Sequence, residues 1–190
     1  MSRVILITGG QRSGKSEWAE RMALSLSDSP VYVATAHVLD EEFRQRVRRH
    51  QERRGPQWTN IEEEMRLADH DLTGRVAVID SVTLWLTNFF FHLDSNTEQA
   101  LAAAKREFDR LAEQDATLIF VTNEIGCGGV SDNALQRRFT DLQGWMNQHI
   151  AQRADEVWWM VSGLPVQIKH ENIQHTTVRQ QDAGGHSQED

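Results

Sequence analysis

The chain has 190 residues, of which 39% are hydrophobic and 25% are charged, and its formal net charge is −8. This length fits one compact domain, and the acidic charge argues against broad nucleic-acid binding, which needs a basic face. No apolar run approaches the roughly 18 residues that a membrane-spanning helix needs. The single cysteine, Cys127, excludes an internal disulfide framework. Because the N-terminus shows no signal-peptide pattern, we expect a cytoplasmic protein.

Five short apolar runs predict the strands of a sheet. In chain order they are residues 4–7, 31–34, 76–79, 118–121 and 157–161. All are apolar on both faces, which is typical of parallel strands that helices cover on each side. Apolar residues at helical spacing predict helices over about 15–26, around 101–111 and over 135–150, the last capped by Ser131 or Asp132. Strands that alternate with helices indicate an α/β fold with right-handed crossovers.

The first predicted strand leads into a glycine-rich segment that matches the phosphate-binding pattern G-x-x-x-x-G-K-[ST] in full. Glycines let consecutive backbone N–H groups point at phosphate oxygens, and the following helix presents its positive N-terminus to the same anion. The lysine should contact the β- and γ-phosphates, and the last serine should bind Mg²⁺. The nucleotide-binding candidates are Gly9, Gly10, Gln11, Arg12, Ser13, Gly14, Lys15 and Ser16. The motif and the strand pattern together predict a P-loop NTPase-type (RecA-like) fold, with a mostly parallel sheet flanked by helices.

A basic cluster follows the second predicted strand, on a chain that is acidic overall. Residues 44–54 hold six arginines against one acidic residue, Glu52, which suggests a small polyanion such as a nucleoside triphosphate as partner. On a helix beginning near Asp40, the side chains of Phe43, Val47 and His50 share one face. From the pattern alone, His50 is either a core histidine or a catalytic group. The arginines are either a binding surface or a solvated helix face.

Two carboxylates follow predicted strands, at the edge where open α/β sheets bind their ligands. Asp80 ends the third strand, where an acid that helps to hold Mg²⁺ is expected. Its alternative role is to cap a helix at the turn that follows the strand. Glu124, which follows the fourth strand, is a weaker candidate for the same cluster. The histidines other than His50 are scattered along the chain and form no pattern of metal ligands.

The C-terminal segment differs in composition from the rest of the chain. Between residues 170 and 190 the only large apolar residues are Ile173 and Val178. A segment with so few apolar side chains cannot offset the entropy lost when a chain becomes ordered. We therefore expect one catalytic domain over residues 1–169 and a polar, flexible tail over residues 170–190.

Several sequence blocks, taken together and in order, resemble one known family. The resemblance runs from about Ile5 to Lys169, and the chain is similar to the bifunctional adenosylcobinamide kinase / adenosylcobinamide-phosphate guanylyltransferases of cobalamin synthesis. One block would be weak evidence, whereas this many in the same order are highly specific. The blocks are residues 8–16, 32–36 and 46–50, Trp58 with Glu62, and residues 80–88, 122–126 and 161–165 running on to 168–169.

The resemblance implies two reactions. In the first, ATP or GTP phosphorylates the hydroxyl of the aminopropanol arm of adenosylcobinamide. In the second, GMP passes from GTP to adenosylcobinamide phosphate through a covalent histidine intermediate, giving adenosylcobinamide-GDP and pyrophosphate. The implied catalytic residues are His50, Lys15 and Asp80, with Ser16 and Asp80 at Mg²⁺. Beyond the P-loop, the implied nucleotide contacts are Ala34, Thr35, Ala36, Gln51, Glu52, Arg53, Arg54 and Glu62.

The resemblance also implies a homotrimer whose partners are nucleotides and the corrinoid substrate, without nucleic acid or a membrane span. Two positions depart from the family's pattern: Ala36 stands where many members have serine, and Pro56 lies one place later than usual. Two other classes of function remain. One is a P-loop kinase for another small-molecule alcohol, in which His50 is structural. The other is a non-catalytic or nucleic-acid-coupled P-loop ATPase, against which the acidic charge argues.

Overall fold

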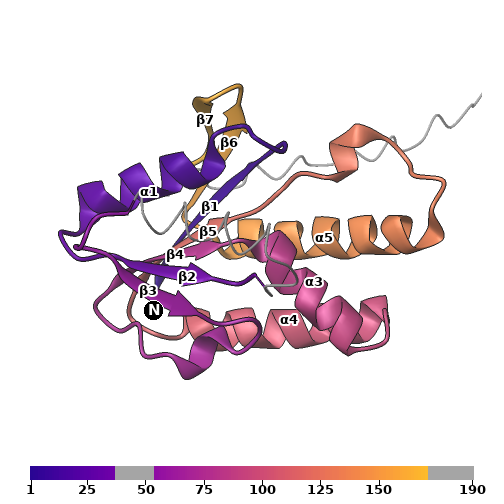
Figure 1. The fold of residues 1–190 in the computed structure, drawn as a ribbon, viewed down its shortest axis with the longest axis horizontal. Helices are drawn as coiled ribbons and strands as arrows, with labels where there is room; N and C mark the ends of the chain where they lie inside the picture. Colours follow the sequence, from indigo (N-terminus) through magenta and orange to yellow (C-terminus); the bar gives the residue numbers. More distant parts are fainter. Residues whose placement is uncertain (37–53, 171–190) are drawn as a thin grey trace, which may run out of the picture.

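The computed structural model describes residues 1–36 and 54–170, and a seven-stranded sheet forms the centre of this part of the chain (Figure 1). The order across the sheet is β3-β2-β4-β5-β1-β6-β7. All neighbouring strands are parallel except β7, which pairs antiparallel with β6. The five predicted strands are confirmed, while β3 and β7 are additional. The strands are β1 (Arg3–Gly9), β2 (Val31–Ala34), β3 (Thr59–Glu62), β4 (Val76–Asp80), β5 (Thr117–Val121), β6 (Glu156–Val161) and β7 (Leu164–Lys169).

Helices cover both faces of the sheet, as Figure 1 shows. Helix α1 (Lys15–Leu26) lies on one face, and α3 (Val82–His92), α4 (Thr97–Ala112) and α5 (Ala134–Arg153) lie on the other. The three predicted helices correspond to α1, α4 and α5, and α3 is additional. Two 3₁₀ turns, η1 (Leu67–Asp69) and η2 (Gly126–Gly128), lie in connections. The helix predicted to begin near Asp40 lies outside the described residues.

The core has two layers, one on each side of the sheet. Along β1, Val4 and Leu6 pack into the layer beneath α3, α4 and α5, whereas Ile5 and Ile7 pack into the layer beneath α1. This alternation follows from the two-residue repeat of a strand, which sends successive side chains to opposite faces. It explains why the inner strands are apolar on both faces, in agreement with the predicted mostly parallel α/β fold.

The N-terminus of α5 differs from the prediction, because neither Ser131 nor Asp132 caps it. Asn133 is the cap, and its Oδ1 accepts hydrogen bonds from the backbone N–H groups of Leu135 (2.8 Å) and Gln136 (3.2 Å). A capping side chain must stand immediately before the first helical residue to reach these donors. Ser131 lies too early, and its hydroxyl instead accepts a hydrogen bond from the Asn133 N–H at 3.2 Å.

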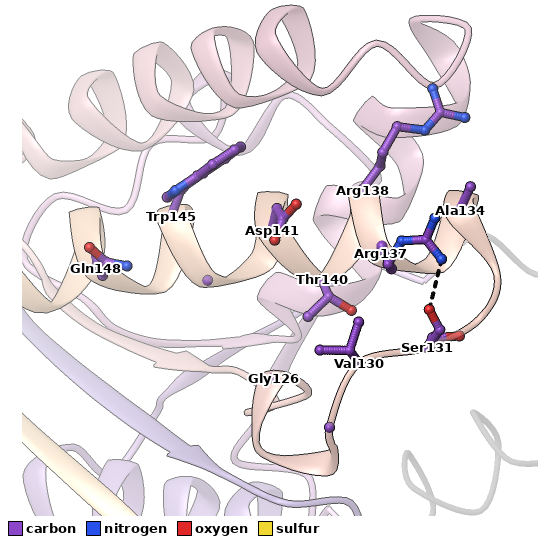
Figure 2. A pocket seen from close by; sticks show the side chains of 12 residues that line it. Gly126, Val130, Ser131, Ala134, Arg137, Arg138, Thr140, Asp141, Trp145 and Gln148 are labelled. Atoms are coloured by element: carbon purple, nitrogen blue, oxygen red, sulfur yellow. Dashed lines mark hydrogen bonds between the residues drawn. The ribbon is translucent and has the colours of Figure 1, made fainter.

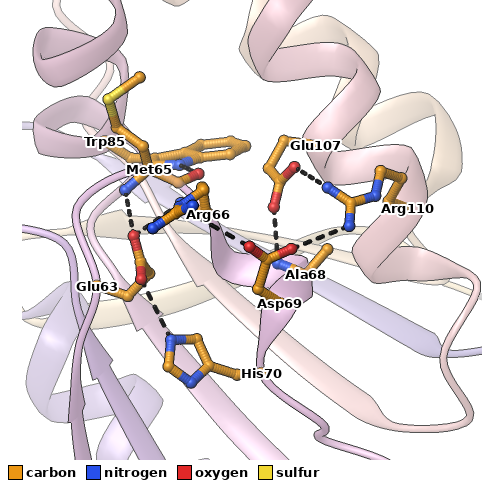
Figure 3. A network of polar contacts seen from close by, with 9 residues as sticks. All are labelled: Glu63, Met65, Arg66, Ala68, Asp69, His70, Trp85, Glu107 and Arg110. Carbon is orange, nitrogen blue, oxygen red and sulfur yellow. Dashed lines mark hydrogen bonds and ion pairs between the residues drawn. The ribbon is translucent and has the colours of Figure 1, made fainter.

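A polar network holds the connection between β3 and β4 against α3 and α4 (Figure 3). The carboxylate of Glu63 accepts hydrogen bonds from the N–H groups of Met65 and Arg66, at 2.9 and 2.8 Å. Glu107 of α4 accepts from the N–H of Ala68 at 2.7 Å and from the Arg110 guanidinium at 2.8 Å. Side chains thus take over the backbone donors of a segment that has no strand partner.

The hairpin of β6 and β7 leaves one apolar face open at the edge of the sheet. Trp159 is paired with Val166, and Val161 with Leu164, and all four side chains are exposed. Ile168 continues the row and is also exposed. We call these five residues the edge face. None of the described helices is both long and apolar enough to cross a membrane.

Candidate nucleotide site

The carboxyl edge of the sheet brings most of the predicted site residues into one row. Glu62 of β3 pairs with Ala34 of β2, and Ala34 pairs on its other side with Asp80 of β4. Asp80 in turn pairs with Val121 of β5, which lies beside Ile7 of β1. The P-loop leaves β1 two residues later. Parallel strands therefore end together, which places the loop, Asp80 and Glu62 along one edge.

The backbone of the P-loop is closely packed where the sequence has glycine. Gly9 has a φ of 153°, and a Cβ at this position would lie only 2.6 Å from the carbonyl oxygen of Met160 in β6. Gly14 has a φ of 91° and stands immediately before α1, beside Gly163. The N–H of Gly163 donates to the carbonyl of Ser13 at 3.0 Å. The turn between β6 and β7 thus supports the phosphate loop from behind.

Lys15 lies within this cradle. Its Nζ donates a hydrogen bond to the carbonyl of Gly10 and lies 3.4 Å from the hydroxyl of Ser13. Burial lowers the pKa of the Lys15 ammonium, and the nearby carboxylate of Asp80 opposes this effect in part. A cation that has lost water in this way interacts strongly with a phosphate that enters the same loop. Ser16, the predicted metal ligand, follows it in the first turn of α1.

Asp80 is held by a residue that the sequence analysis did not assign to the site. The hydroxyl of Tyr32 in β2 donates a hydrogen bond to Oδ2 of Asp80 at 2.7 Å. Burial, and then the charge of Asp80, raise the pKa of Tyr32 well above its ordinary value, so the hydroxyl keeps its proton. The alternative role of Asp80 as a helix cap does not apply, because Ser81 caps α3 through the N–H of Leu84.

Arg54 packs against the same tyrosine. Its guanidinium carbon lies 3.4 Å from the centroid of the Tyr32 ring, and its NH1 lies 3.5 Å from Oε1 of Glu20 in α1. The Arg54 side chain is only 2% exposed, which is rare for arginine unless its charge is compensated. The end of the predicted basic cluster is therefore fixed beside Tyr32 and, through it, beside Asp80.

Thr35 fixes the ends of β2 and β4 relative to each other. Its hydroxyl accepts a hydrogen bond from the N–H of Ser81 at 2.8 Å and donates one to the Ser81 carbonyl at 2.7 Å. Asn88 of α3 donates to the Thr35 carbonyl at 2.8 Å. The predicted contact segment 34–36 is thus rigidly supported at this edge. The predicted residues His50, Gln51, Glu52 and Arg53 lie outside the described residues.

Glu124 follows β5, which lies between β4 and β1 in the sheet. Its N–H donates to the carbonyl of Gly9 at 3.1 Å, and its Oε2 lies 3.5 Å from Nδ2 of Asn147 in α5. Asn147 belongs to a buried network in which its Oδ1 accepts from Thr122 at 2.7 Å and from Gln143 at 2.9 Å. Within residues 1–36 and 54–170, no three histidine, cysteine or acidic side chains form a metal-binding group.

Comparison with known proteins identifies the family. The family model described as "Cobinamide kinase / cobinamide phosphate guanyltransferase" matches residues 5–168. The chain belongs to this family. It is 38% identical over 177 residues to the bifunctional adenosylcobalamin biosynthesis protein CobP of Pseudomonas aeruginosa, covering 88% of this chain and 98% of that protein. It is 37% identical over 184 residues to CobU of Salmonella typhimurium, which carries the same description, covering 87% and 99%.

The match of the cobinamide kinase / cobinamide phosphate guanyltransferase family spans β1 to β7 and includes every predicted site residue. The resemblance stated from the sequence blocks is therefore confirmed. Among solved structures, the flagellar accessory protein FlaH of Methanocaldococcus jannaschii aligns over 88% of this chain and 78% of its own, with 16% identity and a TM-score of 0.45.

Proposed function

We propose that this protein phosphorylates adenosylcobinamide with ATP or GTP and then transfers GMP from GTP to adenosylcobinamide phosphate, giving adenosylcobinamide-GDP and pyrophosphate. The observation that carries the proposal is the family match over residues 5–168. The P-loop beside Asp80 at the carboxyl edge of the sheet supplies the machinery that such a transfer needs. The two curated relatives have bifunctional names and match along nearly their whole length.

In the kinase step, the substrate hydroxyl oxygen attacks the γ-phosphorus, the bond to the β-phosphate oxygen breaks, and the hydroxyl proton is released. The residues of this chain position the phosphates and stabilise the charge that develops during the transfer. The N–H groups of the P-loop and the N-terminus of α1 hold the phosphates. Lys15 stabilises the negative charge that moves onto the leaving oxygen. Tyr32 keeps the Asp80 carboxylate aimed at the edge of the sheet through its 2.7 Å hydrogen bond.

We further propose that Mg²⁺ accompanies the nucleotide. Of the two carboxylate oxygens of Asp80, Oδ2 accepts a hydrogen bond from Tyr32, whereas Oδ1 has no hydrogen-bond partner among the described residues. Oδ1 is therefore an oxygen ligand of the type that Mg²⁺ prefers. The hydroxyl of Ser16 would be the second protein ligand. Mg²⁺ usually binds through one or two protein groups together with substrate phosphates and water, so a dedicated protein cage is not required. When bound, the metal neutralises phosphate charge.

In the transfer step, we assign His50 as the nucleophile. A ring nitrogen of His50 attacks the α-phosphorus of GTP and pyrophosphate leaves. A phosphate oxygen of adenosylcobinamide phosphate then attacks the same phosphorus, and the phosphorus–nitrogen bond breaks. The residue match to the family and the arginines around His50 in the sequence support this assignment. Arg54 supports it further, because it fixes the chain four residues after His50 beside Tyr32.

The assignment of His50 is tested by incubating the protein with GTP and Mg²⁺. We expect one GMP per chain, attached through a phosphoramidate that is labile in acid and comparatively stable in base. The His50→Ala variant should lose the adduct and the transferase step but keep the kinase step, whereas the exposed His92→Ala serves as the matched control and should label normally. GMP on another residue would refute the assignment. Absence of any adduct would favour a kinase for another alcohol.

We also propose that the protein acts as a cytoplasmic homotrimer. The exposed edge face of β6 and β7 supports assembly, because an apolar row on a sheet edge is usually covered by another chain.

A further inference from the structure

A pocket of about 600 Å³ lies between the loop that follows β5 and the outer side of α5 (Figure 2). The loop contributes Gly126, Val130 and Ser131, and α5 contributes a row of side chains that includes Arg138, Asp141 and Trp145. This volume is in the range of small-molecule sites, which is about 300–1,000 Å³. None of the nucleotide-site residues described above lines this pocket.

Glu124 lies next to both the pocket and the phosphate loop. Glu124 donates its N–H to the Gly9 carbonyl of the P-loop at 3.1 Å. A Cβ on the pocket residue Gly126 would lie 3.7 Å from Oε1 of Glu124 and 3.9 Å from Cγ2 of Thr140, which also lines the pocket. The carboxylate of Glu124 therefore stands at the boundary between the two sites.

Hydrogen bonds hold the wall of the pocket in place, and both apolar and polar side chains line it. The Arg137 guanidinium donates to the carbonyls of Ser131 and Asp132, each at 2.9 Å, and so ties the loop to the helix. Trp145 is 46% exposed and Val130 is 88% exposed, which offers apolar surface. Arg138 and Gln148 supply hydrogen-bond donors, and Asp141 supplies an acceptor.

This chemistry suits a large ring that carries neutral amides. A corrinoid has an apolar macrocycle with methyl groups and a periphery of carboxamide arms, each with a donor and an acceptor. Aromatic and aliphatic surface would cover the macrocycle, and side chains of both hydrogen-bonding types would pair with the arms. Its aminopropanol hydroxyl stands on a flexible arm, so the ring can bind at a distance from the phosphate that the hydroxyl attacks.

We propose that this pocket is the docking site for the corrin ring of the phosphoryl acceptor. The ring lies against Trp145 and the open surface at Gly144, and the aminopropanol arm extends past Glu124 to the P-loop. The inference rests on the proposed function and deepens it, because it places the second substrate.

The test fills the pocket without disturbing the nucleotide site. A Cβ at Gly144 would meet no atom within 4 Å, so Gly144→Phe projects a ring into the pocket without a backbone clash. Gly144→Ala adds only one carbon at the same place. Trp145→Ala removes apolar surface instead of adding bulk. The matched control is Ser25→Phe, which places the same ring on an exposed position of α1 on the opposite face of the sheet.

The measurements are the KM for adenosylcobinamide in the kinase reaction, the Kd for the corrinoid by equilibrium dialysis through its visible absorbance, and the Kd for GTP. We expect Gly144→Phe and Trp145→Ala each to raise the corrinoid KM and Kd by roughly tenfold or more, with a GTP Kd within about twofold of wild type. Gly144→Ala should raise both values by less than Gly144→Phe does, and Ser25→Phe should resemble wild type.

The outcomes separate the two proposals. Wild-type turnover with an unchanged corrinoid KM and Kd in both Gly144→Phe and Trp145→Ala would overturn the docking site and leave the proposed function intact. Equal losses of corrinoid and GTP affinity would also overturn it, since they would indicate a general loss of structure. A wild-type protein that neither binds nor phosphorylates adenosylcobinamide would refute the proposed function, and the docking site with it.

Discussion

Lys15 is a cation in a place where a charge is costly, since the residue is only 7% exposed. Burial lowers the pKa of its ammonium despite the opposing charge of Asp80. In Lys15→Met the aliphatic stem remains and the charge is lost. We expect the rate of phosphoryl transfer to fall by roughly two to three orders of magnitude, because the charge on the transferring group is no longer stabilised. The melting temperature without nucleotide should hold or rise.

The pH dependence of folding stability gives a second test of Lys15. A lysine whose folded pKa lies below its ordinary value of 10.5 binds its proton more weakly in the folded state. The contribution of Lys15 to folding stability therefore increases as the pH rises through the folded pKa toward 10.5. Thermal unfolding in this window should show the rise in wild type relative to Lys15→Met. A folded Lys15→Met with near-normal kinase activity would contradict the role of Lys15.

Tyr32 offers a way to test positioning apart from chemistry. Tyr32→Phe removes the hydrogen bond to Asp80 but keeps the ring against Arg54 and Trp58. We expect activity to fall roughly 10- to 100-fold and the Mg²⁺ concentration for half-maximal activity to rise, as for other groups that orient a metal ligand. Tyr32→Leu, which also removes the ring, should lose thermal stability in addition. An unchanged Mg²⁺ requirement in Tyr32→Phe would refute the positioning role.

At the scale of elements, the carboxylate of Glu63 is one of two that hold the connection between β3 and β4. Burial raises the pKa of Glu63, but the N–H groups of Met65 and Arg66 and the ring of His70 outweigh it, so the pKa lies below its ordinary value of 4.5. A depressed folded pKa gives stability that is present above the unfolded pKa and is lost as the pH falls through the folded one. Glu63 therefore stabilises the fold at neutral pH, and this contribution begins to be lost as the pH falls below about 4.5.

Glu63→Gln should reveal this behaviour in thermal unfolding curves. Above pH 5 we expect the melting temperature of the variant to lie several degrees below that of wild type, as for a loss of about 1 kcal/mol in a domain of this size. The two melting temperatures should converge as the pH falls from 4.5 through the depressed folded pKa of Glu63. A difference that stays constant over this range would mean that Glu63 acts through packing and not through its charge.

The elements that could be predicted from the sequence are those whose burial requires a recognisable run of apolar residues. β1, β2, β4 and β5 are buried on both faces, so they appear in the sequence as continuous apolar runs, and β6 appears as one because its exposed face is apolar too. Strand β3 was not predicted because it is a polar edge strand with exposed residues such as Thr59 and Asn60. Strand β7 contains Pro165 and alternates, and its antiparallel pairing depends on the turn at Ser162 and Gly163.

Some features of the candidate site could likewise be predicted from the sequence, and others could not. The P-loop was predictable because its chemistry needs fixed residue types at fixed spacing. The bond from Tyr32 to Asp80 was not, since it exists only because β2 lies beside β4 in the sheet order. Arg54 reads as a surface arginine in the sequence, and its burial depends on Glu20 from another helix. Contacts between distant residues leave no periodic signal in one sequence.

At the scale of the whole molecule, the edge face predicts how chains assemble. Val166 is 46% exposed in the middle of this face. A glutamate there would place a charge in a contact that excludes water, which costs several kcal/mol if it cannot be solvated. We expect wild type to have the mass of a trimer by light scattering at micromolar concentration, and Val166→Glu to be smaller. Gln99→Glu, exposed at the start of α4, is the control and should remain trimeric. A monomeric wild type would refute the trimer.

Strand β1 lies inside the sheet, between β5 and β6, and this position limits when the fold can form during synthesis on the ribosome. Ile5 pairs with Ile119 on one side and with Glu156 on the other, so β1 can complete its pairing only after β5 and β6 have been synthesised. The P-loop needs a still later part of the chain, because the Ser13 carbonyl accepts a hydrogen bond from the N–H of Gly163. Such pairing between distant segments forms slowly and late. In a nascent chain that ends before Gly163 the phosphate loop lacks this hydrogen bond, so we expect nucleotide capture only after the turn between β6 and β7 has been synthesised.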